Sequence, residues 1–114
     1  MIHKDLKVWK KSMELVVRIY ELTHLLPKNE QYGLASQMQR AAVSIPSNIA
    51  EGAGRNSIKE YIRFLYISHA SLNELASQYQ ICLALKLCPA DHDLYDMIDH
   101  VGRLLMNLIK SLNK

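Results

Sequence analysis

Residues 40–52 read RAAVSIPSNIAEG, a stretch with the composition and apolar spacing of an α-helix but with a proline at its centre. Inside a helix, Pro46 lacks the N–H that would bond the carbonyl of Ala42, and its ring clashes with that carbonyl, at a cost of about 3 kcal/mol. A helix that keeps such a residue is expected to use the bend or the freed carbonyl. We therefore predict a helix kinked at Pro46, and we expect Ser47 or Asn48 to bond the freed carbonyl.

Helical periodicity continues on both sides of this stretch, and no alternating strand pattern interrupts it. Pro27 and the two residues after it are expected to end the first helix and cap the second, and Gly52 and Gly54 are expected to stop the second. The predicted helices cover about residues 6–26, 30–53, 57–82 and 91–112. Short connections between long amphipathic helices predict an all-α fold: an up-down-up-down antiparallel four-helix bundle with a proline-kinked second helix, in one domain over residues 1–114.

The third helix has the best-defined start. Ser57 is followed three residues later by Glu60, which predicts a capping box in which each side chain bonds the backbone at the other residue. From there, residues at spacings of three and four predict a seam for long antiparallel packing. The seam residues are Ile58, Tyr61, Leu65, Ser68, Leu72, Leu75, Tyr79 and Cys82.

Large apolar side chains lie on nearly all sides of the third helix. They are Tyr61, Ile62, Phe64, Leu65, Tyr66 and Ile67. A single bundle covers one face of each helix, so we expect the chain to form a homo-oligomer.

Composition limits the class of protein. With 114 residues and 49% apolar content, the chain fits one domain. Its longest apolar run, residues 81–85, is far short of the ~20 residues of a membrane span, and residues 1–5 lack the apolar segment of a secretory signal. Cys82 and Cys88 form neither a metal pattern nor a disulfide framework. We expect a cytoplasmic protein with no membrane partner.

The net charge of +3 is unevenly placed. Residues 1–28 carry six Lys or Arg against three Asp or Glu, whereas residues 87–114 carry three against four. The basic start is concentrated in Lys4, Lys7, Lys10 and Lys11, at the front of the first helix. These four lysines are the candidate nucleic-acid contacts, with a solvated helix face as the alternative.

The chain resembles the four-helix-bundle family encoded in intervening sequences within 23S ribosomal RNA genes, over nearly its whole length. The residues that carry the resemblance are Leu6-Lys7-Val8-Trp9, Tyr20 with Pro27, Tyr32-Gly33-Leu34, Gln37, residues 40–52, Gly54-Arg55, Arg63-Phe64-Leu65 and Glu74-Leu75. Members of the family look similar to the accessory protein of diversity-generating retroelements, a bundle that assembles into a five-fold ring and binds nucleic acid and a reverse transcriptase. The resemblance thus implies a pentamer and a nucleoprotein context, and the family has no established enzymatic activity.

A polar stripe crosses the second helix. Its members are Gln37, Arg40, Ser44, Asn48, Glu51 and Arg55, which advance by three or four residues. We expect Arg40 and Glu51 to pair with Arg63 or Glu74 of a neighbouring helix or subunit, which would make the stripe a structural or interface element. A ligand-binding role for the stripe is the alternative.

Other patterns do not reach the requirements of a reactive site. The loop over residues 52–57 lacks the Gly-Lys-Ser/Thr ending of a nucleotide loop and is better explained by helix caps. Glu21 and His24 have the spacing of one di-iron motif, but such a site needs two motifs and further glutamates. The aspartates of residues 91–99 lack the glycine and terminal glutamate of a calcium loop. We therefore predict no catalytic residue, no metal, no cofactor and no enzymatic activity.

These observations together predict a non-enzymatic, homo-oligomeric bundle that acts as a nucleoprotein accessory and binds RNA or DNA weakly and electrostatically. The alternative is a protein–protein interaction scaffold that does not bind nucleic acid.

Overall fold

The computed structural model describes residues 3–114 and contains four α-helices, with no strand in that range. The helices are α1 (Lys7–His24), α2 (Leu34–Ala53), α3 (Ile58–Ala84) and α4 (His92–Leu112), and two short 3-10 helices, η1 (His3–Asp5) and η2 (Lys28–Glu30), precede α1 and α2. The predicted all-α, four-helix fold is confirmed.

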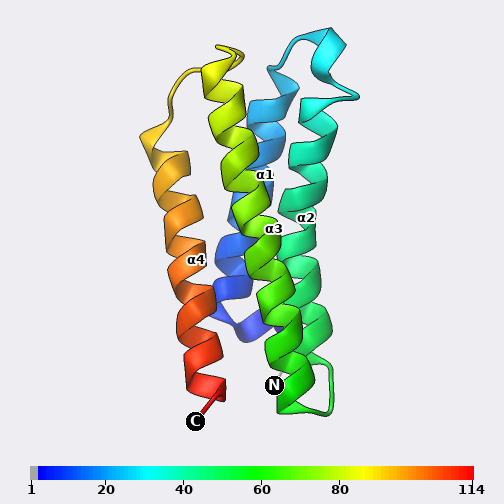
Figure 1. The fold of residues 1–114 in the computed structure, drawn as a ribbon, viewed down its shortest axis with the longest axis vertical. Coiled ribbons are helices and arrows are strands. Elements are labelled where there is room, and N and C mark those ends of the chain that lie inside the picture. The colour runs from blue at the N-terminus through cyan, green and yellow to red at the C-terminus, as the bar shows by residue number, and fades with distance from the viewer. Residues whose placement is uncertain (1–2) are drawn as a thin grey trace.

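The four helices stand side by side along the 44 Å long axis of the molecule. In Figure 1 the ribbon climbs along α1, returns along α2, climbs along α3 and returns along α4. Each helix packs against the next in sequence, and α4 also packs against α1. In the described part of the chain, no Cα atom of α1 lies within 8 Å of one in α3, and none of α2 lies within 8 Å of one in α4. The α1–α2 face of the bundle therefore lies opposite the α3–α4 face.

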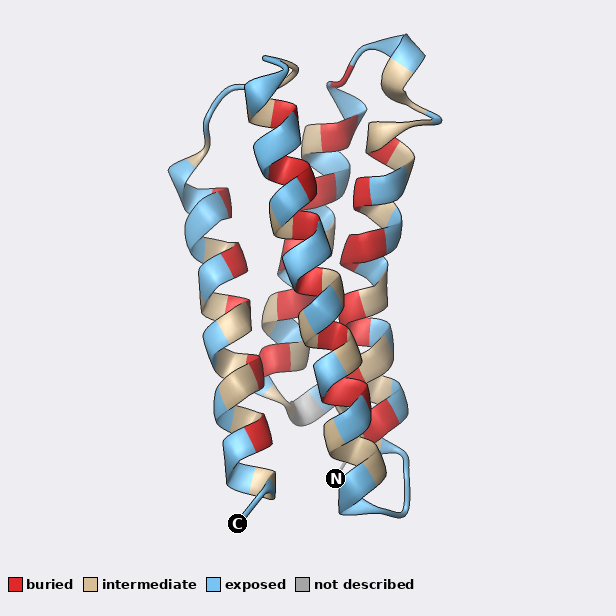
Figure 2. Cartoon of the chain, in the orientation of Figure 1, coloured by how far each residue is buried: buried red, intermediate tan, exposed pale blue. Residues whose placement is uncertain are grey.

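Buried residues, red in Figure 2, lie on the sides of the helices that face the inside of the bundle. All four helices contribute, with Leu15, Ile45, Leu75 and Leu105 among the fully buried residues. None of the helices within residues 3–114 has the combination of length and apolar character that a membrane crossing requires.

Pro46 is buried within α2, which continues without interruption from Leu34 to Ala53. Ser47 Oγ donates a hydrogen bond to the Val43 carbonyl at 2.7 Å, and Asn48 Nδ2 donates one to the Ser44 carbonyl at 2.8 Å. The expectation that either side chain bonds the carbonyl freed by Pro46 is therefore wrong, because each reaches one turn back from its own position. The bend at Pro46 stays a prediction.

The start of α2 lies four residues after the predicted one. η2 and a turn fill the interval after Pro27, and Gly33, with φ −108° and ψ −108°, precedes the first helical residue. Glu30 Oε1 accepts a hydrogen bond from the Leu34 amide at 3.5 Å, so the side chain that serves this helix start belongs to Glu30 rather than to Asn29.

Gly52 lies inside α2 and is buried against α3. A Cβ at this position would lie 2.8 Å from the Cβ of Phe64 and 3.1 Å from the carbonyl oxygen of Tyr61. Its role is thus to let two helices approach closely, not to stop α2 as predicted. Gly54 is the residue that caps the end of α2, in a right-handed conformation with φ −86°.

The capping box at the start of α3 is half formed. Ser57 Oγ accepts a hydrogen bond from the Glu60 amide at 3.2 Å, as predicted. The Glu60 carboxylate instead binds Arg63, with both bonds at 3.1 Å. The predicted seam is largely correct, since every member after Tyr61 is buried, but Ile58 is exposed.

The bundle covers α3 more completely than the sequence pattern suggests. Phe64 and Leu65 are buried within the chain, and Tyr61, Ile62 and Ile67 are half-buried. Among these large side chains only Tyr66 is exposed. The surface of α3 therefore does not supply the reason for oligomer formation that the sequence suggested.

Candidate nucleic-acid interface

Basic residues gather in one half of the bundle. We call residues 3–15, 44–70 and 102–114 the basic half, because the antiparallel helices bring these segments to the lower half in Figure 1, around the α2–α3 connection. This half holds ten of the fourteen Lys and Arg residues but four of the eleven Asp and Glu residues, a formal charge of +6. The acidic half, residues 16–43 and 71–101, holds four against seven, a formal charge of −3.

Four of the ten cations in the basic half are held in ion pairs. Lys11 pairs with Glu14 at 3.4 Å, Arg55 with Glu51 at 3.7 Å, Arg63 with Glu60 at 3.1 Å, and Arg103 with Asp99 at 3.2 Å. The other six are exposed lysines that form no ion pair with any side chain described: Lys4, Lys7, Lys10, Lys59, Lys110 and Lys114. Their ammonium groups are available to an anionic partner.

The predicted lysine cluster is divided by the structure. Lys4 lies in η1, and Lys7 and Lys10 lie in the first turns of α1, all exposed. Lys11 is half-buried beside α4, where it lines a groove with Glu14 and His100. Three of the four predicted lysines are therefore accessible to a partner, whereas Lys11 is half-buried and already paired with Glu14.

Sequence reasoning missed the contribution of α3 and α4 to this basic half. Lys59 lies in the first turn of α3, and Lys114 lies after the end of α4. The two lysines line one groove together, separate from the groove beside Lys11. The two residues are 55 positions apart in the sequence, so no local pattern groups them. The signal lay in the predicted antiparallel order, which puts the start of the third helix beside the end of the fourth.

The arginines of this half hold the α2–α3 connection in place. The guanidinium carbons of Arg55 and Arg63 lie 4.8 and 4.5 Å from the centre of the Phe64 ring, which gives two cation–π contacts. The hydrogen bond from Arg63 also keeps the pKa of Glu60 below its usual value. These interactions give both arginines a structural role, which leaves the six lysines without a described ion pair as the available cations.

Part of the polar stripe on α2 forms hydrogen bonds that connect α2 with α3. Ser44 Oγ and Ser71 Oγ, from α2 and α3, are 2.8 Å apart, and Asn48 Nδ2 donates to Ser44 Oγ at 2.9 Å. Gln37, Arg40 and Glu74 are exposed.

The predicted pairing of Arg40 or Glu51 with Arg63 or Glu74 does not occur within the described chain. Glu51 pairs instead with Arg55, four residues later and just after the end of α2, and Arg63 pairs with Glu60, three residues earlier on α3. In both cases a partner about one turn away in the sequence is the nearer one.

The acidic half carries structural contacts around Asp91. Asp91 accepts a hydrogen bond from the Leu94 amide at 3.1 Å and an ion pair from Arg18, which together keep its pKa below the usual value. Glu21 and His24 are both exposed. Among residues 3–114, no three His, Cys, Asp or Glu side chains are arranged to hold a metal ion. Burial raises the pKa of Cys82 to about 12, so its thiol stays protonated.

Comparisons with known proteins give a family match and a solved structure with the same fold. A family model described as 23S rRNA-intervening sequence protein matches residues 4–107. A solved structure, of a protein with unknown function from the S23 ribosomal protein family of Bacteroides thetaiotaomicron VPI-5482, has a TM-score of 0.85 and 24% identity, covering 96% of this chain and 99% of that chain. That similarity shows a common fold, while curated proteins give no match. Because the family model matches most of the sequence, the chain belongs to the family of 23S rRNA-intervening sequence proteins.

Proposed function

We propose that the protein is a non-enzymatic, homo-oligomeric nucleoprotein accessory that binds RNA or DNA weakly through its basic half. The main support is the set of six exposed lysines without a described ion-pair partner, gathered in a half with a formal charge of +6. A lysine ammonium is a compact charge suited to phosphate, and each phosphate that it neutralises releases counterions.

The distribution of charge also sets the character of this binding. The net charge of the whole chain is +3, and the acidic half repels phosphate, so a nucleic acid would approach from the basic half only. Lysines recognise charge rather than base edges, so sequence preference is expected to be slight. The proposal places the protein in the cytoplasm, with the RNA or DNA that it contacts.

Assembly would strengthen a contact that is weak in one chain. In a homo-oligomer, which the resemblance suggests is a pentamer, the same lysines recur once per subunit, and binding at one subunit raises the effective concentration of phosphate at the next. Exposed apolar side chains on α1, among them Val17 with 58% of its surface exposed, support self-association.

The direct test is a titration of labelled single- and double-stranded RNA and DNA followed by fluorescence anisotropy. We expect measurable binding at about 50 mM salt that weakens at about 200 mM, with a slope near −0.9 in log affinity per log salt for each phosphate contact on duplex DNA. The triple variant Lys7→Gln, Lys10→Gln, Lys59→Gln should lose most of the affinity and much of the salt dependence.

A matched control separates local charge from total charge. The variant Lys28→Gln, Arg40→Gln, Lys86→Gln also removes three charges from exposed positions, but from the acidic half. The two triple variants have the same net charge, so the proposal expects the control to bind nucleic acid as the wild type does. Equal loss in both variants would show that total charge alone governs the interaction.

A protein-interaction scaffold is the second candidate, favoured by the exposed apolar side chains of α1. It predicts no binding of any nucleic acid by the wild type even at low salt. That result would reject the nucleoprotein role and leave the scaffold.

A further inference from the structure

The two cysteines of the chain lie together in the acidic half of the bundle, at its upper end in Figure 1. Cys82 is in the last turn of α3 and fully buried, and Cys88 is half-buried in the connection from α3 to α4. Leu26 and Ala35 form a small buried cluster with Cys82, and Cys88 packs against that cluster. Both thiols are free in the structure, and the lysines of the basic half are at the other end of the molecule.

The backbone after α3 turns back toward Cys82. Lys86 has a φ of 57°, in the left-handed region, and its amide donates a hydrogen bond to the Leu83 carbonyl at 3.0 Å. The Leu87 amide donates one to the Cys82 carbonyl, also at 3.0 Å. These two bonds form the Schellman motif, which reverses the chain at the end of a helix. The turn brings Cys88 back to the end of α3, although six positions separate it from Cys82.

The side chains of the two cysteines are in contact. Burial is the main reason that the pKa of Cys82 rises to about 12, and a hydrogen-bond contact with the Cys88 thiol adds to the rise. The Glu30 carboxylate, from η2, also faces Cys82 and disfavours its thiolate. Cys82 is therefore protonated near pH 7 and closed to solvent. The half-buried Cys88 is the thiol that a dissolved oxidant can reach.

The connection leaves Cys88 free to adjust its position. No backbone–backbone hydrogen bond among the described residues involves residues 88–90. The next anchor is Asp91, whose amide donates a hydrogen bond to the Tyr79 hydroxyl at 2.9 Å. A small shift of Cys88 toward Cys82 thus breaks no backbone hydrogen bond, which allows the two sulfur atoms to reach bonding distance.

We propose that Cys82 and Cys88 form a peroxide-sensitive site that closes to a reversible disulfide within one chain. In the first step the Cys88 thiolate attacks hydrogen peroxide: an S–O bond forms, the O–O bond breaks, hydroxide leaves, and Cys88 becomes a sulfenic acid. In the second step the sulfur of Cys82 attacks the sulfur of Cys88: the S–S bond forms, the S–O bond breaks, and the hydroxyl group leaves with the proton of Cys82 as water. The two cysteines together lose two electrons to one peroxide. A dithiol reverses the reaction and is itself oxidised to a cyclic disulfide.

The protonated state of Cys82 sets the relative rates of the two steps. A thiolate attacks sulfur much faster than a thiol does, so the second step is expected to be the slower one. The sulfenic acid should therefore persist long enough for dimedone, a reagent specific for sulfenic acids, to trap it. The trapped residue should be Cys88, because Cys82 is closed to solvent.

The test treats the reduced, folded wild type with hydrogen peroxide. Intact mass spectrometry should show a loss of two hydrogen atoms, peptide mapping should find Cys82 joined to Cys88 in one chain, and dithiothreitol should restore both thiols. Dimedone added with the peroxide should label Cys88 and reduce the yield of disulfide. Two thiols that stay free, a disulfide between two chains, or a dimedone label on Cys82 would each overturn the proposal.

Single variants separate the roles of the two thiols. Cys88→Ser should leave Cys82 reduced under the same exposure, because the accessible thiol is gone. Cys82→Ala should stop at an oxidised Cys88 that dimedone labels and that forms no disulfide within the chain. Circular dichroism shows whether each variant keeps its helices. Oxidation of Cys82 in a folded Cys88→Ser variant at the rate of the wild type would contradict the assigned order.

A matched control moves one thiol instead of removing it. The double variant Cys88→Ser, Ala90→Cys keeps two cysteines, but the second lies at an exposed position two residues further on, outside the buried cluster. It leaves Cys82 unchanged, so it also serves if Cys82→Ala fails to fold. We expect it to form the disulfide within the chain about tenfold more slowly or not at all, because the contact between the two sulfur atoms is lost. Equal rates in this variant and the wild type would mean that closeness in sequence is sufficient, and would reject a site built by the fold.

Discussion

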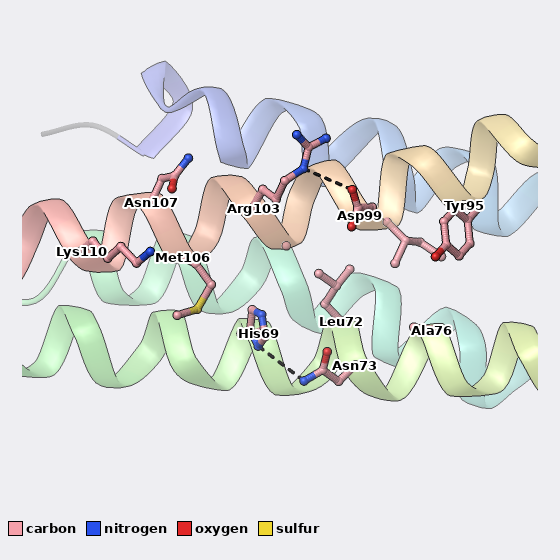
Figure 3. A pocket seen from close by; sticks show the side chains of 12 residues that line it. His69, Leu72, Asn73, Ala76, Tyr95, Asp99, Arg103, Met106, Asn107 and Lys110 are labelled. Atoms are coloured by element: carbon pink, nitrogen blue, oxygen red, sulfur yellow. Dashed lines mark hydrogen bonds and ion pairs between the residues drawn. The ribbon is translucent and has the colours of Figure 1, made fainter.

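The contacts of α3 with α2 and with α4 differ in kind. Against α2, the helix packs closely enough that Gly52 has no room for a Cβ, and Ser68 Oγ donates a hydrogen bond to the Ile45 carbonyl at 2.8 Å in a buried site. Against α4, the nearest neighbour of a Cβ on Gly102 would be a methyl of Leu72 at 3.2 Å, and a groove opens outside it. One side of α3 holds the fold together, and the other borders the open groove that Figure 3 shows.

The largest expected effect comes from adding a side chain at the close contact between α2 and α3. Gly52→Ala would place a Cβ 2.8 Å from the Cβ of Phe64, an atom bonded directly to the backbone of α3 that cannot rotate away. The helices must separate, so we expect the free energy of unfolding to fall by about 2 kcal/mol, within the usual range for overpacking. Urea denaturation followed by circular dichroism measures it. An unchanged or higher stability would show that the α2–α3 contact is looser than its geometry indicates.

A smaller effect should come from the buried hydrogen bond on the same side. Ser68→Ala removes the donor to the Ile45 carbonyl without leaving a buried donor unpaired, so a loss of about 1 kcal/mol in the free energy of unfolding is expected. The matched change on the groove side is Asn73→Ala, at an exposed position bonded only to His69 at 3.5 Å. It should change stability by less than about 0.5 kcal/mol. Equal losses in the two variants would remove the distinction between the sides.

Helix starts that depend on a nearby side chain could be predicted from the sequence, whereas the close contact of α2 with α3 and the groove between α3 and α4 could not. The starts of α3 and α4 follow from Ser57 and Asp91, whose side chains cap the helix beside them and so act through local sequence. The start of α2 was missed because the conformation of Gly33 and the turn before it decide the boundary.

The candidate site was predicted in part for the same physical reason. Lys4, Lys7 and Lys10 are neighbours in sequence and form a recognisable pattern. Lys59 and Lys114 come together at one groove through the packing of α3 against α4, which no local pattern encodes. The groove likewise depends on how far two helices stand apart, and that distance is set by side chains from both.

Acid should weaken the attachment of α4 more than the contact between α2 and α3. The pKa of Asp91 is lowered in the folded protein, chiefly by its bond to the Leu94 amide and also by Arg18. A lowered pKa gives stability that is present above the unfolded value, near 3.8, and is lost as the pH falls through the folded value.

Asp91→Asn provides the measurement, because asparagine still caps a helix but does not titrate. The melting temperature of the wild type should exceed that of the variant at pH 7, and the difference should shrink as the pH falls below about 4. A difference that stays constant down to pH 2 would mean that Asp91 contributes through its shape and not through its charge.

The smallest effect is expected at Gly102 of α4, which faces α3 as Gly52 of α2 does. Gly102→Ala would bring a Cβ to 3.2 Å from Leu72 Cδ2, the far end of a side chain that can rotate, and the groove beside it gives that methyl room to move. Alanine also favours a helix interior over glycine by about 1 kcal/mol. These effects oppose each other, so the free energy of unfolding should stay the same or rise by up to about 0.5 kcal/mol, measured beside Gly52→Ala under the same conditions. The test is which of the two alanine variants has the higher free energy of unfolding, and we expect it to be Gly102→Ala. If Gly102→Ala loses as much stability as Gly52→Ala, then α4 is packed against α3 as rigidly as α2 is, and the Leu72 methyl has no room to move into the groove.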